Sequence, residues 1–218
     1  MTMQPGPLGR RPGTDARGAG YGTAVAPKTS DGGIRSALGA GIGFTVLTWV
    51  VFFFNKIFFF GELNQSLGLR PLDTHGLWGI LFAPVLHGNL EHLMANTLPA
   101  ALFAALIAFT SKRLWFQVTA IVMLVSGVGT WFIGGVGTAH VGASGLVYGW
   151  LAFLIVRGFY NRAPGQILLG MILGFGYSGL LWGVFPTQMG VSWQMHLFGA
   201  IGGIIAASML KRGKATAK

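Results

Sequence analysis

The sequence contains no cysteine, and only 9% of its 218 residues are charged. The absence of cysteine excludes disulfide bonds, thiolate nucleophiles and cysteine-ligated metals. The scarcity of charge is equally informative, because soluble proteins carry about 25% charged residues. With 52% hydrophobic residues and a mean hydropathy of +0.62, the chain has the composition of a membrane protein.

Acidic residues are the scarcest charged class. There are five, against 15 lysines and arginines, and all five precede residue 92: Asp15, Asp31, Glu62, Asp73 and Glu91. A net charge of +10 would suggest nucleic-acid binding in a soluble protein. Here the basic residues lie at the ends of apolar runs, with no basic stripe interleaved with aromatic residues, so we expect no nucleic-acid partner.

The two ends of the chain differ from its middle. Residues 1–35 are basic, rich in glycine and proline, and without apolar periodicity. Such a segment cannot bury enough surface to offset the entropy of ordering, so we predict a disordered tail. Residues 212–218 form a second basic tail, and residues 36–211 make up the predicted membrane domain.

Six segments are long and apolar enough to be membrane helices, which need about 20 residues. They are residues 37–60, 90–109, 114–133, 143–159, 166–185 and 192–210. If both termini are cytoplasmic, every basic residue except Lys56 and Arg70 lies on the cytoplasmic side, as the positive-inside rule requires. The sequence therefore predicts an all-α protein of six spans with both termini in the cytoplasm.

The first outer connection, residues 61–89, is long and partly apolar. Trp78 and its apolar neighbours favour short helices in the interfacial layer, where amphipathic aromatic side chains are preferred. A re-entrant segment is the alternative, but Pro71 and Pro84 enclose a stretch too short to cross the membrane.

Polar side chains are costly within hydrocarbon and usually face the interior of a helix bundle. His92 and Asn96 lie in the second predicted span, Ser144 in the fourth and His196 in the sixth. All three spans run inward from the outer surface, and each polar group lies within about 10 Å of its span's start, at 1.5 Å per residue. The topology therefore predicts that these side chains lie at one depth, just below the outer surface.

The fourth and sixth spans are predicted to touch along small residues. Ser144 and Tyr148 share one helix face because they are four residues apart. Glycines recur four residues apart on both helices, at Gly145 and Gly149 and at Gly199 and Gly203. Such pairs allow helix backbones to approach closely, and a serine and a histidine need to come within about 3 Å for proton transfer.

A serine beside a histidine predicts nucleophilic catalysis. Ser144 would attack a carbonyl, and His196 would take the proton and return it to the leaving amine. No acidic residue follows the second span, so a dyad is expected, with the Tyr148 ring holding His196. The Ser144 amide, the Asn96 amide group and the His92 ring would stabilise the oxyanion.

With these motifs the chain resembles the rhomboid family of intramembrane serine proteases over residues 40–210. The motifs are His87-x4-His92-x3-Asn96, then Gly142-Ala143-Ser144-Gly145 with Tyr148, then His196-x2-Gly199-x3-Gly203. The resemblance implies Ser144 and His196 as catalytic residues, His92 and Asn96 as the oxyanion hole, and His87 as a supporting residue. It implies cleavage of transmembrane substrates near their outer ends, without a cofactor. One departure is Gly79 after Trp78, where many bacterial members carry arginine.

Other interpretations remain open from the residues alone. Ser144 could be a helix-packing serine, His196 an interfacial histidine, and Tyr148 an ordinary core residue. His140 has no predicted role. Three of the five histidines could converge with water on zinc, although no HExxH motif is present. A non-catalytic rhomboid-like binding protein is an alternative, and a transporter a more distant one.

The expected setting is the plasma membrane, with the site open to the outer side and single-span membrane proteins as substrates. The sequence leaves the oligomeric state open. In the fifth span and just before it, six glycines weaken helix packing: Gly165, Gly170, Gly174, Gly176, Gly179 and Gly183. This span could move sideways to admit a substrate, or its glycines could pack tightly.

Overall fold

The computed structural model describes residues 31–211, and its regular elements are helices. Residues 1–30 of the predicted N-terminal tail and all of the predicted C-terminal tail, residues 212–218, lie outside the described residues. Residues 31–35, which were assigned to the disordered N-terminal tail, are described, and Ile34 and Arg35 already belong to the first helix. The long helices are α1 (Ile34–Phe58), α4 (Leu90–Thr110), α5 (Lys112–Ile133), α6 (Ser144–Asn161), α7 (Pro164–Gly176) and α8 (Trp193–Met209).

Three of these helices, α4, α5 and α8, begin close to the predicted starts and have a polar side chain that caps the first turn. Asn89 accepts a hydrogen bond from the amide of His92 at the start of α4, and Ser111 accepts one from Leu114 at the start of α5. Ser192 caps α8 in the same way, through the amide of Met195. Each cap satisfies an amide that the helix itself leaves without a partner.

Three of the described helices, α1, α4 and α5, are long and apolar enough to cross a membrane. A fourth candidate exists if α7 and the 3-10 helix η3 (Ser178–Val184), which meet at 69°, count as one span. Helices α6 and α8 have 18 and 17 residues, or about 27 and 25 Å of length, against a hydrocarbon core of about 30 Å. The six predicted segments are thus helical, but only three or four qualify as spans by length and composition.

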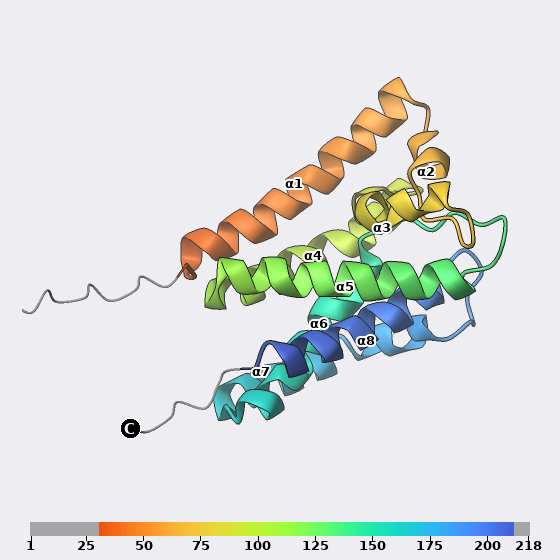
Figure 1. Cartoon of the computed structure of the whole chain (residues 1–218). Coiled ribbons are helices and arrows are strands. Elements are labelled where there is room, and N and C mark those ends of the chain that lie inside the picture. The colour runs from red at the N-terminus through yellow and green to blue at the C-terminus, as the bar shows by residue number, and fades with distance from the viewer. Residues whose placement is uncertain (1–30, 212–218) are drawn as a thin grey trace, which may run out of the picture.

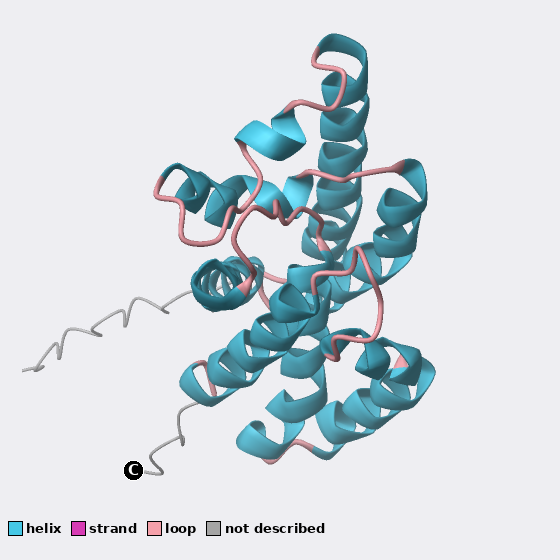
Figure 2. Cartoon of the chain, turned by 90° about the vertical axis from the view of Figure 1, so that its right-hand side faces the viewer, coloured by secondary structure: helices cyan, strands magenta, loops and turns pink. Residues whose placement is uncertain are grey.

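The helices are arranged around α6, which contacts α4, α5, α7 and α8. Helix α1 packs mainly on α4, on the opposite side of the bundle from α7 and α8 (Figure 1). The start of α1 and the end of α8 lie at the same end of the bundle (Figure 1). Figure 2 looks onto the other end, where loops gather beside the short helices α2 (Leu63–Ser66) and α3 (Gly79–Phe82).

Helices α6 and α8 touch backbone to backbone. A methyl group added to Gly199 would collide with the carbonyl oxygen of Gly145, and one added to Gly203 would collide with that of Gly149. These are the two glycine pairs that the sequence placed on facing helices. Because no side chain separates the two backbones, residues beside the glycines on one helix can reach residues on the other.

The fifth predicted span is bent rather than straight. Helix α7 ends at Gly176, and η3 departs at 69° after Tyr177. Its glycines serve different purposes: a methyl on Gly170 would lie 2.6 Å from the carbonyl oxygen of Ile155 on α6, whereas Gly176 and Gly179 face open space. The segment is therefore packed tightly on α6 at Gly170 and again at Gly183, where a methyl would collide with Tyr148, and it is open between them at Gly176 and Gly179.

The first outer connection contains the predicted short helices: α2, η1 (His75–Trp78), α3 and η2 (Ala83–Val85). It is tied to the bundle by backbone hydrogen bonds between Leu69 and His140 and by the indole of Trp131, which donates to the carbonyl of Asp73 at 2.9 Å. The Arg70 guanidinium, 2.7 Å from the Asp73 carboxylate, holds the pKa of that carboxyl below its usual value.

The glycine contact between α6 and α8 makes a stability prediction. Gly203→Ala should lower the free energy of unfolding by about 1–3 kcal/mol, because the new methyl must displace the Gly149 carbonyl. The matched control is Gly43→Ala on α1, where a methyl meets nothing within 4 Å and alanine favours the helix by about 0.5–1 kcal/mol. Thermal unfolding in detergent measures both, and equal midpoints would contradict this packing.

Candidate active site

His196, in the first turn of α8, has its ring fixed on two sides. The ring stacks on Tyr148 of α6, with centroids 4.1 Å apart and planes 7° from parallel. Its Nδ1 lies 2.8 Å from the carbonyl oxygen of Gly183 in η3. A carbonyl oxygen can only accept a hydrogen bond, so Nδ1 carries the hydrogen and Nε2 keeps its lone pair. The arrangement leaves Nε2 as the nitrogen able to take a proton.

Ser144 is the first residue of α6 and is buried. It lies one turn before Tyr148 on the same face of the helix, so the stack on Tyr148 brings the His196 ring to that face. Among the described residues, the Ser144 hydroxyl and the His196 ring are not hydrogen-bonded to each other; the bond to Gly183 uses Nδ1 and leaves Nε2 open. Such contacts are often long before substrate binds and tighten afterwards.

The segment before Ser144 turns sharply against His92. Gly142 has a φ of +124°, a backbone conformation that residues other than glycine rarely adopt. A methyl at Gly142 would also lie 2.5 Å from Cε1 and 2.6 Å from Nε2 of the His92 ring. The glycine thus places an imidazole of α4 directly against the backbone that leads into Ser144.

His87 supports the same segment from the other side. Its Nε2 accepts a hydrogen bond from the amide of Ala143 at 3.4 Å, and its ring meets that of His92 edge-on at 5.1 Å. Burial, with a smaller effect from His92, lowers the pKa of His87 to about 4. The ring is therefore neutral at pH 7 and can accept this hydrogen bond.

Asn96 lies one turn after His92 and is buried. Its side-chain amide donates a hydrogen bond of 2.9 Å to the His92 carbonyl. This bond uses one of the two hydrogens of the Asn96 NH2 group. The second hydrogen is available to another acceptor. Of this pair, it is the His92 ring that lies against the segment leading into Ser144.

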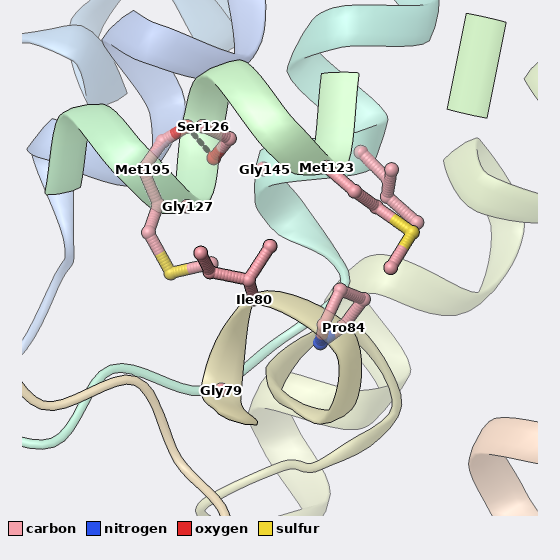
Figure 3. A pocket seen from close by; sticks show the side chains of 9 residues that line it. Gly79, Ile80, Pro84, Met123, Ser126, Gly127, Gly145 and Met195 are labelled. Carbon is pink, nitrogen blue, oxygen red and sulfur yellow. Dashed lines mark hydrogen bonds between the residues drawn. The ribbon is translucent and has the colours of Figure 1, made fainter. Parts of the chain in front are cut away.

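A small cavity of about 10 Å³ lies behind the site, between α3, α5, α6 and α8 (Figure 3). On its wall the Ser126 hydroxyl of α5 donates to the carbonyl of Met195 at 3.0 Å, which holds the residue before His196 (Figure 3). A methyl on Gly145 would lie 2.7 Å from that hydroxyl oxygen. Gly145 therefore makes room both for α8 and for the bond from α5.

Sequence reasoning missed four residues that make hydrogen bonds around the site: Ser126, Gly183, His140 and Ser192. Ser126 and Gly183 act through single hydrogen bonds across segments far apart in the chain, which no local pattern signals. His140 and Ser192 carried a weak signal, since each polar side chain stands four residues before a predicted catalytic residue. No cluster of three or more metal-binding side chains occurs within residues 31–211.

Much of the chain is similar to known proteins. The family model of the rhomboid domain matches residues 74–213. An uncharacterized protein of Mycobacterium tuberculosis is 42% identical over 180 residues, covering 77% of this chain and 75% of that protein. Another from Mycobacterium leprae is 44% identical over 179 residues, covering 77% and 71%. A Bacillus subtilis protein named "Putative rhomboid protease YdcA" is 29% identical over 144 residues, covering 65% and 71%.

The hydrogen bond to Gly183 predicts the tautomer of His196. In protein carrying 15N-labelled histidine, the neutral His196 ring should show a protonated Nδ1 and a bare Nε2, because only Nδ1–H can bond to the carbonyl. Nitrogen NMR measures this, and the spectrum of His196→Ala assigns the signal. A ring protonated at Nε2 would contradict the arrangement.

Proposed function

The chain belongs to the rhomboid family, and from that premise we propose that it is an intramembrane serine endopeptidase. Ser144 is the nucleophile and His196 the base of a catalytic dyad. The observation that carries this proposal is the fixed ring of His196, stacked on Tyr148 and hydrogen-bonded through Nδ1 to Gly183. This geometry supports the proposal because it leaves Nε2 with its lone pair, on a ring that stacks one helical turn from Ser144.

In the first step the Ser144 hydroxyl oxygen forms a bond to the carbonyl carbon of the substrate peptide. His196 Nε2 takes the hydroxyl proton, and the carbonyl electron pair moves onto oxygen. The His196 ring then carries a positive charge, which the Gly183 carbonyl stabilises as a hydrogen-bond acceptor at Nδ1. Collapse of the intermediate breaks the C–N bond, and Nε2 returns the proton to the leaving amine.

The negative oxygen of the intermediate needs donors already in place. Ser144 begins α6, so the amides of its first turn have no partner within the helix, and the helix dipole favours negative charge there. The His92 ring and the second hydrogen of the Asn96 amide complete the oxyanion hole from α4. Water then attacks the acyl-enzyme by the reverse sequence, with Nε2 again accepting the proton.

The composition of the chain and its apolar helices support action within a membrane. We propose six crossings with both termini cytoplasmic, a site opening to the outer side of the plasma membrane, and single-span membrane proteins as substrates. A helical peptide bond has its carbonyl already hydrogen-bonded, so the substrate helix must unwind locally before attack. Small and helix-breaking residues near the cut should therefore favour cleavage. The mechanism uses no cofactor.

The dyad makes the central prediction. Ser144→Ala and His196→Ala should each lower kcat by at least about a thousandfold, because nucleophile and base act as a unit. Both should also abolish labelling by a fluorophosphonate probe. The measurements are cleavage of a single-span reporter and probe labelling, with the full chain in detergent.

The control is His75→Ala, which removes an exposed imidazole of the first outer connection and should leave turnover unchanged. A well-folded wild-type protein that binds the reporter but neither cleaves it nor reacts with the probe would show a non-catalytic binding protein instead. Activity lost on adding a chelator and restored by zinc would contradict the dyad.

Gly183 makes a second functional prediction. A methyl at Gly183 would collide with the Tyr148 hydroxyl and lie 3.0 Å from His196 Nδ1. Gly183→Ala should therefore lower kcat about tenfold or more by displacing the ring. Tyr148→Phe removes the nearest clashing atom. The fall in kcat from Tyr148→Phe to the double variant Gly183→Ala/Tyr148→Phe should therefore be smaller than the fall from wild type to Gly183→Ala.

The matched control is Gly179→Ala on the same segment, where a methyl meets nothing within 4 Å and turnover should not change. Equal losses for Gly179→Ala and Gly183→Ala would show that the segment tolerates no alanine, rather than that Gly183 orients the base.

A further inference from the structure

His140 is buried in the loop before α6 and joins four separate segments. Its backbone pairs with Leu69 of the first outer connection through two hydrogen bonds of 2.8 and 3.0 Å. Its ring Nε2 lies 3.0 Å from the carbonyl oxygen of Gly134, at the end of α5, and 2.9 Å from the Thr138 hydroxyl. Its Nδ1 lies 2.6 Å from the hydroxyl of Ser192, the cap of α8.

One tautomer satisfies all of these contacts. The Gly134 carbonyl can only accept, so Nε2 carries the hydrogen of the neutral ring and Nδ1 accepts from the Ser192 hydroxyl. The Ser192 oxygen still accepts from the amide of Met195. Burial lowers the pKa of His140, which favours this neutral form.

The contact joins the two halves of the proposed dyad. His140 precedes Ser144 by four residues, in the loop that leads into α6. Ser192 precedes His196 by four residues, and its carbonyl accepts the hydrogen bond of the His196 amide at 3.3 Å. A single side-chain bond therefore fixes the start of α8 relative to the start of α6, at the end of the helix pair where the reaction would occur.

We propose that His140 is a positioning residue, which sets the His196 ring against Ser144 by holding the Ser192 hydroxyl. The inference rests on the proposed function, because it assigns His140 a role in the same reaction. The need for such a clamp follows from the glycine contact between α6 and α8. Gly145 and Gly199 let the backbones touch but present no interlocking side chains, so they do not by themselves fix how far one helix slides along the other.

A displacement of about 1 Å between nucleophile and base can cost up to about a hundredfold in rate. Loss of the clamp should therefore lower kcat rather than weaken substrate binding. This separates positioning from a binding role, which would raise KM. It also separates positioning from general stability, because the helices would stay folded through their remaining contacts.

The test uses the full chain in detergent with a single-span reporter, measuring kcat, KM, the rate of fluorophosphonate labelling and the thermal midpoint. Ser192→Val and Ser192→Thr form a matched pair of nearly equal shape, and only threonine keeps the hydroxyl. His140→Phe keeps a ring but no nitrogen, and the double variant Ser192→Val/His140→Phe completes a cycle. Thr187→Val, an exposed hydroxyl in the loop before α8, is the control.

We expect Ser192→Val and His140→Phe each to lower kcat and the labelling rate about tenfold, with KM within about twofold of wild type. Ser192→Thr should restore most of the rate, and Thr187→Val should not change it. The double variant should be no slower than the slower single one, because both remove the same bond. Additive losses, a rise in KM instead of a fall in kcat, or unchanged kcat would overturn the inference.

If His140→Phe does not fold, the Ser192 pair still decides: a wild-type kcat in Ser192→Val overturns the proposal. Failure of the proposed function looks different. In that case wild-type protein itself neither cleaves the reporter nor reacts with the probe, and the inference falls with it. Failure of the inference alone leaves an active wild-type enzyme whose rate does not depend on the clamp.

Discussion

The direct contact between the backbones of α6 and α8 is the constraint on which the rest of the site depends. Gly145 and Gly199 allow this contact because they have no side chain. A single methyl at either position would clash with its neighbours. Only with the helices this close can Tyr148 of one helix stack at 4.1 Å on His196 of the other. Larger side chains along this seam would push the imidazole away from the face that carries Ser144.

A membrane site has reason to avoid a buried carboxylate, since an ionised group is expensive in a medium of low dielectric. In the proposed dyad, the Gly183 carbonyl accepts from Nδ1 of His196, the position that an acid holds in a serine–histidine–aspartate triad. The carbonyl fixes the tautomer of His196 without burying an ionised group. It also links the His196 ring to η3, the half of the fifth segment that follows the 69° bend.

Hydropathy predicted the six helical segments to within a few residues, because apolar runs and capping residues are local signals. The bend after Tyr177 was missed, since the fifth segment is apolar on both sides of it. Six full spans were expected, but α6 and α8 are short. His140 was left without a role because its partner Ser192 lies 52 residues away. A histidine in a loop has no periodic pattern that would mark it as buried.

The sequence by itself determined the membrane character, the order of the helices and the residue types at the site. Composition and spacing are properties of the chain alone, and Ser144 and Tyr148 share a helix face because they are four residues apart. Tertiary structure alone decided which nitrogen of His196 is left basic and which segments hold it. Those answers depend on the hydrogen bond that Gly183 accepts from His196 and on the one that Ser126 donates to Met195. The partners in each bond meet only when distant segments pack together.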